Sequence, residues 1–130
     1  MKRILLDSDV IIDILRGFKG TIEAVGDLYE GNELWISRIS EAEIFAGKDM
    51  GDEERREAIS RFLSKFEKVE LTNEILKLAG DFKRKYGLTL LDCIIAATAY
   101  AAGAELFTKN LRDFGKVEEI AIHRPKGSKS

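Results

Sequence analysis

Hydrophobic positions along the chain fall into short apolar runs, separated by stretches in which apolar residues recur at helical spacing. The short runs have the length and composition of strands, and they predict strands at residues 3–6, 33–37, 68–71, 105–108 and 119–122. The spaced stretches predict helices at residues 10–16, 21–30, 40–47, 52–66, 73–86 and 90–102. Strands that alternate with helices indicate an α/β fold, with a mostly parallel sheet of about five strands and helices on both faces.

The helix predicted at residues 90–102 differs from the others because it is apolar and rich in alanine nearly all round. Such a helix is buried on several sides, against the sheet and neighbouring helices or against a second subunit. Its small side chains at Ala97, Ala101 and Ala102 permit close approach of whatever packs there.

Composition limits the chain to one domain and excludes some classes of function. It has 130 residues, of which 45% are hydrophobic and 34% charged, so it can bury a core without disulfides or a structural metal. We expect one domain at residues 1–123 and a basic, flexible tail at 124–130. The net charge of −2 excludes a protein that holds nucleic acid mainly through a strongly basic surface. Any nucleic-acid contact must therefore be local or mediated by metal.

The rare residue types restrict the chemistry further. A single cysteine, Cys93, excludes an internal disulfide, and a single histidine, His123, excludes chemistry that needs two imidazoles. The longest apolar run, residues 93–100, is far shorter than the roughly 20 residues of a membrane span. We therefore expect a cytoplasmic protein with no membrane segment, and the groups available for catalysis are carboxylates.

Acidic residues follow the predicted strands or begin the apolar helix. They are Asp7 and Asp9, Glu41 and Glu43, Asp92, and Asp113 with the polar Asn110 nearby. Because ligands bind beyond the carboxyl ends of parallel strands, we expect these side chains to converge there. Carboxylates that share a partly buried site repel one another unless cations lie between them. Oxygen ligands of this kind favour Mg²⁺ or Mn²⁺, whereas neither Cys93 nor His123 has the spacing of a zinc ligand.

Each acid also has a purely structural interpretation. The segments 40–43 and 89–92 match the capping box, in which an acid pairs with a backbone N–H at a helix start. Asp9 fits the N-cap of the first helix, and Asp113 fits a surface turn. For Asp7, at the end of an apolar strand, no capping role is expected. The combination of acids therefore carries more weight than any one of them.

Four blocks of the sequence resemble, in order, the four motifs of PIN-domain ribonucleases. The blocks span nearly the whole chain and are residues 5–13, 39–47, 91–99 and 106–114. The sequence is most similar to the VapC-type toxins of prokaryotic toxin–antitoxin pairs. The resemblance implies a three-layer α/β/α fold and a metal-dependent endoribonuclease.

The resemblance also implies roles for particular residues. By motif, the catalytic acids are Asp7, Glu43, Asp92 and Asp113, which would bind one or two Mg²⁺ or Mn²⁺ ions, partly through water. Asp9, where many relatives have Asn or Ser, adds a carboxylate to the metal site, and Asn110 matches a polar position beside the fourth acid. Further expectations are RNA as substrate, a homodimer, and a small VapB-like antitoxin that covers the acidic cleft. Its contact surface is expected at Ile14, Leu15 and the helix at residues 22–29.

Basic residues near the acids are candidates for contacts with RNA phosphates. They are Lys109 and Arg112 in the fourth block and Arg16 at the end of the first helix. The alternative for each of them is solvated surface charge.

Two other functions are compatible with the same residues. Residues 5–10 also resemble the nucleophile block of haloacid dehalogenase-type phosphatases, with Asp7 as nucleophile, Asp9 as general acid and Thr72 after a later strand. That interpretation leaves Glu43 and Asp92 unexplained. The other alternative is a non-catalytic interaction module, whose acids only cap helices and whose alanine-rich helix forms a dimer face.

Overall fold

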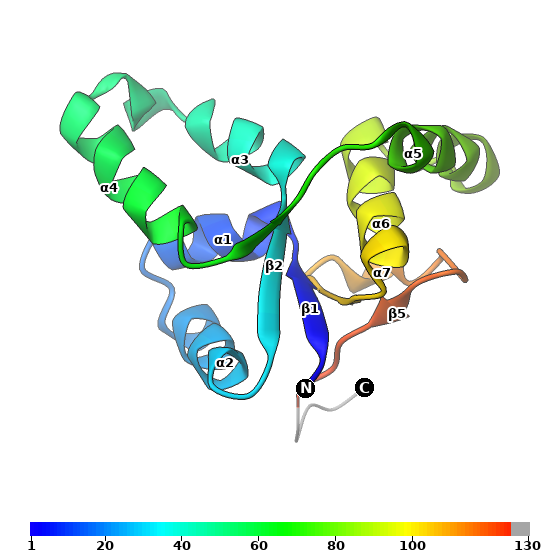
Figure 1. Cartoon of the computed structure of the whole chain (residues 1–130), viewed down its shortest axis with the longest axis horizontal. Coiled ribbons are helices and arrows are strands. Elements are labelled where there is room, and N and C mark those ends of the chain that lie inside the picture. Colours follow the sequence, from blue (N-terminus) through cyan, green and yellow to red (C-terminus); the bar gives the residue numbers. More distant parts are fainter. Residues whose placement is uncertain (126–130) are drawn as a thin grey trace.

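The sheet has five strands, all parallel, in the spatial order β3-β2-β1-β4-β5. A computed structural model describes residues 1–125 and is shown in Figure 1. The strands are β1 (Arg3–Leu6), β2 (Glu33–Ser37), β3 (Glu67–Val69), β4 (Glu105–Phe107) and β5 (Ala121–Ile122). Strand β1 is central, with Leu5 in register with Trp35 of β2 and Leu106 of β4. The predicted number of strands and their parallel direction are confirmed.

Helices cover both faces of the sheet, which makes the predicted three layers. The helical segments are α1 (Ser8–Leu15), α2 (Lys19–Tyr29), α3 (Arg38–Phe45), the 3₁₀ turn η1 (Lys48–Gly51), α4 (Glu53–Leu63), α5 (Asn73–Tyr86), α6 (Leu90–Ala102) and α7 (Leu111–Phe114). Helices α1 to α4 lie on one side of the sheet, and α5 and α6 lie on the other (Figure 1).

Alternation along the strands divides the core in two. In β1, Ile4 and Leu6 pack with the helices α1 to α4, while Leu5 packs with α5 and α6. All three side chains are fully buried. Because successive strand residues point to opposite faces, a strand covered on both sides reads as a continuous apolar run, as residues 4–6 do.

Several predicted boundaries were wrong. Helix α3 begins at Arg38 rather than Ser40, because Ser37 at the end of β2 is already its N-cap and accepts a hydrogen bond from the Ile39 N–H. The capping box expected at residues 40–43 is therefore absent, and Ser40 lies inside the helix. Strand β3 ends at Val69, and Thr72 caps α5 instead of ending a strand. The short segments η1 and α7 were not predicted.

Helix α6 is buried along its middle only. Residues Cys93 to Ala99 are all buried, whereas Leu90, Leu91 and Tyr100 near its ends are exposed. Of the predicted tail at 124–130, residues 126–130 lie outside the described part of the chain. Within residues 1–125, no helix is long and apolar enough to cross a membrane.

We predict that Ala97→Leu lowers the free energy of unfolding by about 1–3 kcal/mol, because Ala97 is fully buried and the added atoms have no space in the packed core. Ala101→Leu, at an exposed position of the same helix, is the matched control and should leave stability within about 0.5 kcal/mol. The measurement is equilibrium unfolding in guanidinium chloride. Equal stability of the two variants would contradict the close packing of α6.

Candidate active site

The Asp7 carboxylate is buried at the carboxyl end of the central strand. Its Oδ1 accepts a hydrogen bond from the Ser8 N–H at 2.8 Å, and its Oδ2 accepts one from the Thr108 hydroxyl at 2.8 Å. The Asp7 N–H donates to the Phe107 carbonyl at 3.0 Å, which joins the ends of β1 and β4. Asp7 is 4% exposed, so its position is determined by contacts with both strands and with α1.

Asp7 also caps α1, contrary to the expectation that it has no capping role. The helix starts at Ser8 directly after the strand, with no turn between them, so the residue that ends β1 is also the N-cap. Asp9 was considered for that cap, but it lies in the first turn of the helix and is exposed. A carboxylate there is favoured by the N-terminal end of the helix dipole.

Burial raises the pKa of the Asp7 carboxyl from 3.8 to about 6. The largest cause is loss of hydration on burial, and the negative charges of Asp9 and Asp92 raise the pKa further. The hydrogen bonds from Thr108 and Ser8 lower it in part. A carboxylate surrounded in this way is stabilised by any cation that binds beside it.

Asp92 and Asp113 enter the same site from two other helices. Asp92 lies in the first turn of α6, where its N–H donates to Oγ1 of the N-cap Thr89 at 3.2 Å. Partial burial raises the pKa of the Asp92 carboxyl, and the charges of Asp113 and Asp9 raise it too. Asp7, Asp9, Asp92 and Asp113 therefore form one electrostatic cluster at the carboxyl ends of β1 and β4.

Asn110 positions Asp113. Its side-chain amide Nδ2 donates to Asp113 Oδ2 at 3.1 Å, and its Oδ1 accepts from the Asp113 N–H at 3.4 Å as the N-cap of α7. Thr108 Oγ1 accepts from the Asn110 N–H at 3.0 Å while its hydroxyl donates to Asp7. This loop thus holds both the first and the fourth of the predicted catalytic acids.

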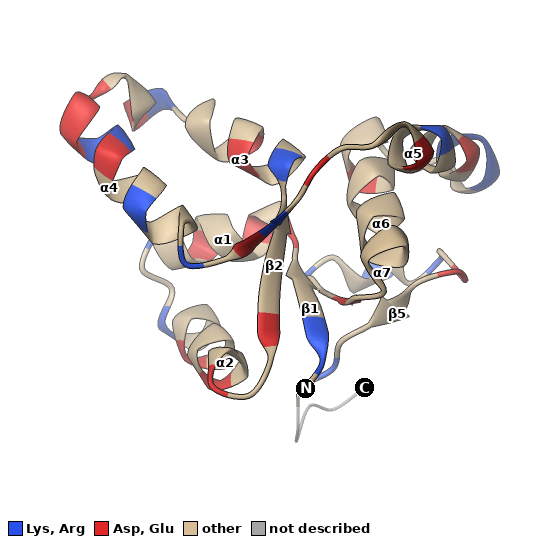
Figure 2. Ribbon diagram, in the orientation of Figure 1, with Lys and Arg blue, Asp and Glu red and all other residues tan. Residues whose placement is uncertain are grey.

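Glu43 is held to the cluster by two serine hydroxyls. Ser8 Oγ lies 2.6 Å from Glu43 Oε1 and 2.8 Å from Ser40 Oγ, and Ser40 is fully buried. A hydroxyl donates one proton, and a carboxylate only accepts, so Ser8 donates to Glu43 and accepts from Ser40. The chain of two hydroxyls fixes α3 against the start of α1. Figure 2 shows the acidic segments of α1, α3 and α6 around the end of β1.

Sequence reasoning missed the hydroxyls that position these acids. Ser8 follows Asp7, Ser40 lies one helical turn before Glu43, and Thr108 ends the strand predicted at residues 105–108. Each of them lies close to an acid in the sequence, which could have indicated its role. Ser40 was instead interpreted as a helix cap.

The three basic candidates differ in their surroundings. Lys109 forms an ion pair with the buried Asp13 and its ammonium lies 5.6 Å from the centre of the Phe18 ring, so it ties the loop after β4 to α1. Arg16 and Arg112 are exposed, and within residues 1–125 neither has a carboxylate oxygen within 4.0 Å. Their charges are therefore available to a ligand, whereas that of Lys109 is already paired.

The groups that could hold a metal are carboxylate oxygens, from Asp7, Asp9, Glu43, Asp92 and Asp113. In the described part of the chain, no three Asp, Glu, His or Cys side chains lie close enough together to hold an ion as they stand. Some of these carboxylates would therefore hold an ion through a water molecule and not directly. Cys93 is buried in the core and its pKa is raised by burial, so it is not a thiolate ligand.

Sequence comparison gives the family directly. The chain matches the PIN domain over residues 4–120. The chain belongs to the PIN-domain family. Ribonuclease VapC10 of Mycobacterium tuberculosis is 36% identical over 95% of this chain and 98% of that protein. Ribonuclease VapC19 of the same species is 30% identical over 85% of this chain and 90% of its own length. This PIN domain is therefore a member of the VapC ribonucleases.

Solved structures of toxin–antitoxin complexes have the same fold. A chain of a complex from Klebsiella pneumoniae superposes on this PIN domain with a TM-score of 0.76, at 27% identity, over 91% of this chain and 95% of that chain. A chain of VapBC2 from Rickettsia felis, bound to a promoter DNA fragment, gives 0.78 at 20% identity, over 93% and 97%. The family assignment does not favour the phosphatase alternative. Thr72, which that alternative placed at the end of a strand, caps α5 beyond an edge strand two places from β1.

We predict that the raised pKa of Asp7 makes the protein less stable at neutral pH when no metal is present. Between its unfolded pKa of 3.8 and its folded pKa of about 6, the folded state holds a proton that the unfolded state has lost. The free energy of unfolding therefore falls as pH rises through this window, and Asp7 accounts for about 2–3 kcal/mol of that fall. Asp7→Asn removes this contribution. An asparagine still caps α1, and its amide can donate to Thr108.

The measurement is urea unfolding in EDTA at about pH 4 and about pH 7. Asp7→Asn should show a smaller decline between the two than wild type, and Asp27→Asn, at an exposed position of α2, should match wild type. A decline unchanged by Asp7→Asn would contradict the raised pKa.

Proposed function

We propose that this PIN domain is a divalent-metal-dependent endoribonuclease of the cytoplasm, with Asp7, Glu43, Asp92 and Asp113 as its catalytic acids. The observation that carries the proposal is the acidic cluster at the carboxyl ends of β1 and β4. There the charges of Asp9 and Asp92 raise the pKa of Asp7, and those of Asp113 and Asp9 raise the pKa of Asp92. Neighbouring carboxylates that destabilise one another's charged forms suit a site whose positive charge comes from bound cations.

The chemistry of the donors suits Mg²⁺ or Mn²⁺. The four catalytic acids offer hard oxygen ligands. Asp9, which is exposed, adds a fifth carboxylate. When bound, a divalent cation supplies the charge that activates water and stabilises the negative charge developed as the phosphodiester is cleaved.

The residues of the chain have separable tasks in this proposal. Asp7 is buried, and two hydrogen bonds, one of them the helix cap, fix its carboxylate before any ion binds. Glu43 accepts from Ser8 through Oε1, so its Oε2 would be the oxygen that helps to hold a metal or accepts a proton from water. Asp92 and Asp113 complete the negative site from α6 and α7, and the amide of Asn110 orients Asp113. No imidazole takes part, since His123 pairs with Glu105 on β4.

We predict that Asp92→Asn reduces Mn²⁺-dependent cleavage of single-stranded RNA at least about 100-fold, because it removes one charged ligand while nearly preserving shape. Asp27→Asn is the control for a lost surface carboxylate and should cleave like wild type. The assay uses end-labelled RNA of mixed sequence, with EDTA as the blank. A Mn²⁺-induced rise in melting temperature should also be smaller in Asp92→Asn.

Three results would contradict the assignment. Full activity of Asp92→Asn would remove Asp92 from the mechanism. Turnover of a phosphomonoester without any cutting of RNA would favour the phosphatase alternative. Neither cutting nor a Mn²⁺-induced thermal shift in wild type would favour the non-catalytic module.

We further propose that the protein is the toxin of a VapBC-type pair and that a small antitoxin binds it. The related structures are toxin–antitoxin complexes. An apolar groove between α1, α2 and α4 offers a surface for an amphipathic segment of such a partner, with a volume of about 380 Å³. The homodimer also stays a prediction, for which the exposed Leu90, Leu91 and Leu111 beside the acids provide apolar surface.

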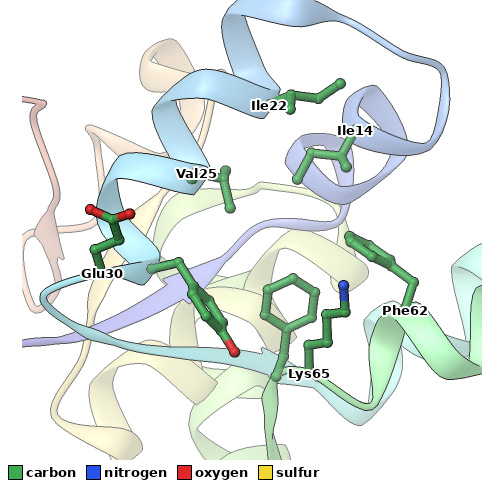
Figure 3. Close-up of a pocket in the computed structure, with 9 residues that line it drawn as sticks. Ile14, Ile22, Val25, Glu30, Phe62 and Lys65 are labelled. Carbon is green, nitrogen blue, oxygen red and sulfur yellow. The ribbon is translucent and has the colours of Figure 1, made fainter.

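Figure 3 shows how this groove is lined. Ile14 of α1, Ile22 and Val25 of α2, and Phe62 of α4 face a common space. Ile22 is 42% exposed, so apolar surface remains for a partner to cover. Ile14 and the α2 residues lie in the segments expected to contact the antitoxin.

We predict that Ile22→Asp weakens antitoxin binding at least about tenfold, because a charge would be buried at the centre of an apolar contact. Glu23→Gln, at the exposed neighbouring position of α2, is the control. Each variant is co-expressed with a VapB-like antitoxin that binds the wild type, and the complex is measured by size-exclusion chromatography. A stable complex with Ile22→Asp would place the antitoxin elsewhere.

A further inference from the structure

A second groove opens beside Glu43, on the side of α3 that faces α1 and the start of α4. It has a volume of about 550 Å³, and its lining residues come from α1, α3, η1 and α4 and the residues that directly follow α1 and α3. Its apolar lining includes Ile12, Leu15 and Met50. None of its lining residues is aromatic. This groove is distinct from the apolar groove of Figure 3, which lies against α2 and the other end of α4.

The rim of this second groove carries basic side chains. Arg16, Lys48 and Arg55 line it, against two carboxylates, Glu43 and Asp49. Arg55 is half-buried and its Nε donates to Asp49 Oδ2 at 3.0 Å, so its charge is largely matched. Arg16 and Lys48 are exposed, and neither has a carboxylate oxygen within 4.0 Å among residues 1–125. The second groove therefore presents two positive charges without an ion-pair partner, beside the one carboxylate of Glu43, on a chain whose net charge is −2.

Glu43 connects this groove to the acidic cluster. The same side chain lines the groove and accepts a hydrogen bond from Ser8, the residue next to Asp7. A polymer whose reacting phosphate lies at the acids would therefore meet this groove next to Glu43. Its following phosphates would come to Arg16 and Lys48.

We propose that this groove holds the RNA backbone next to the cleaved bond, with Arg16 and Lys48 as phosphate-contacting residues. The inference rests on the proposed ribonuclease function and deepens it, by naming the path of the substrate. The unpaired side chains of Arg16 and Lys48 can bind phosphates, and the apolar lining can contact riboses and the faces of bases. Contacts to phosphates do not read base identity, so the groove contributes affinity that does not depend on sequence. An antitoxin segment is the other possible occupant, and the free charges favour RNA over it.

The test is RNA binding without catalysis. Fluorescence anisotropy of a labelled single-stranded RNA of mixed sequence is measured in EDTA over a series of KCl concentrations, for wild type and for the double variant Arg16→Gln/Lys48→Gln. Each phosphate contact on single-stranded nucleic acid contributes about 0.7 to the slope of log affinity against log salt. The double variant should lose about 1.4 from this slope and bind several-fold more weakly at low salt. Both positions are exposed, so its melting temperature should equal that of wild type.

The control removes the same charge from another surface. Arg61→Gln/Lys77→Gln changes exposed residues on α4 and α5 outside the groove and should keep the wild-type slope. Equal slopes for the two double variants would overturn the proposal, as would wild type that does not bind RNA. Unchanged RNA binding with loss of antitoxin binding would assign the groove to the antitoxin and also overturn it. RNA binding is measured in EDTA, without cleavage. The result therefore tests the groove separately from the proposed metal-dependent nuclease activity.

Discussion

The buried carboxylate of Asp7 is the constraint on which the site depends. It lies where the central strand ends, between β2 and β4, and one side chain there caps α1, binds Thr108 and faces the other acids. Burial of a charge is costly unless it is paired, and here the neighbouring charges are also negative. The folded chain therefore holds electrostatic strain that a bound cation would relieve. A protein without that function would gain stability from a neutral side chain at this position.

Neutral groups, most of them side-chain hydroxyls, hold the acids in place, rather than other charges. Thr108 donates a hydrogen bond to Asp7, and Thr89 caps the helix that carries Asp92. Ser8, which accepts from Ser40, donates to Glu43. A hydroxyl can fix a carboxylate without neutralising it, whereas a lysine or arginine would remove the charge that a metal needs. Lys109 shows the contrast, since its ammonium is directed to Asp13 and the Phe18 ring and away from that role. These contacts therefore fix the carboxylates in position and leave their negative charge for a bound cation.

Helices α1 and α4 organise the surfaces around the site. Two grooves share them as walls, one apolar against α2 and one with free positive charges against α3 and η1. The different linings suit two kinds of ligand, a protein segment in the first and a phosphate chain in the second. Because both grooves use α1, which Asp7 caps, a ligand in either one lies next to the helix that follows the first acid.

The sequence alone determined the order of strands and helices, the parallel sheet and the acids at its edge. Apolar runs and helical spacing are local properties, and in a parallel sheet the residues after each strand must meet at one edge. The motif blocks also identified the family. Only the tertiary structure decided which charges are free, because Lys109 meets Asp13 from a position 96 residues away. The tertiary structure also decided the role of Ser40, which depends on the packing of α3 against α1. It likewise decided that Asp7 caps α1, because the helix starts directly after the strand. Side-chain pairing between distant segments follows from packing geometry, which no local pattern records.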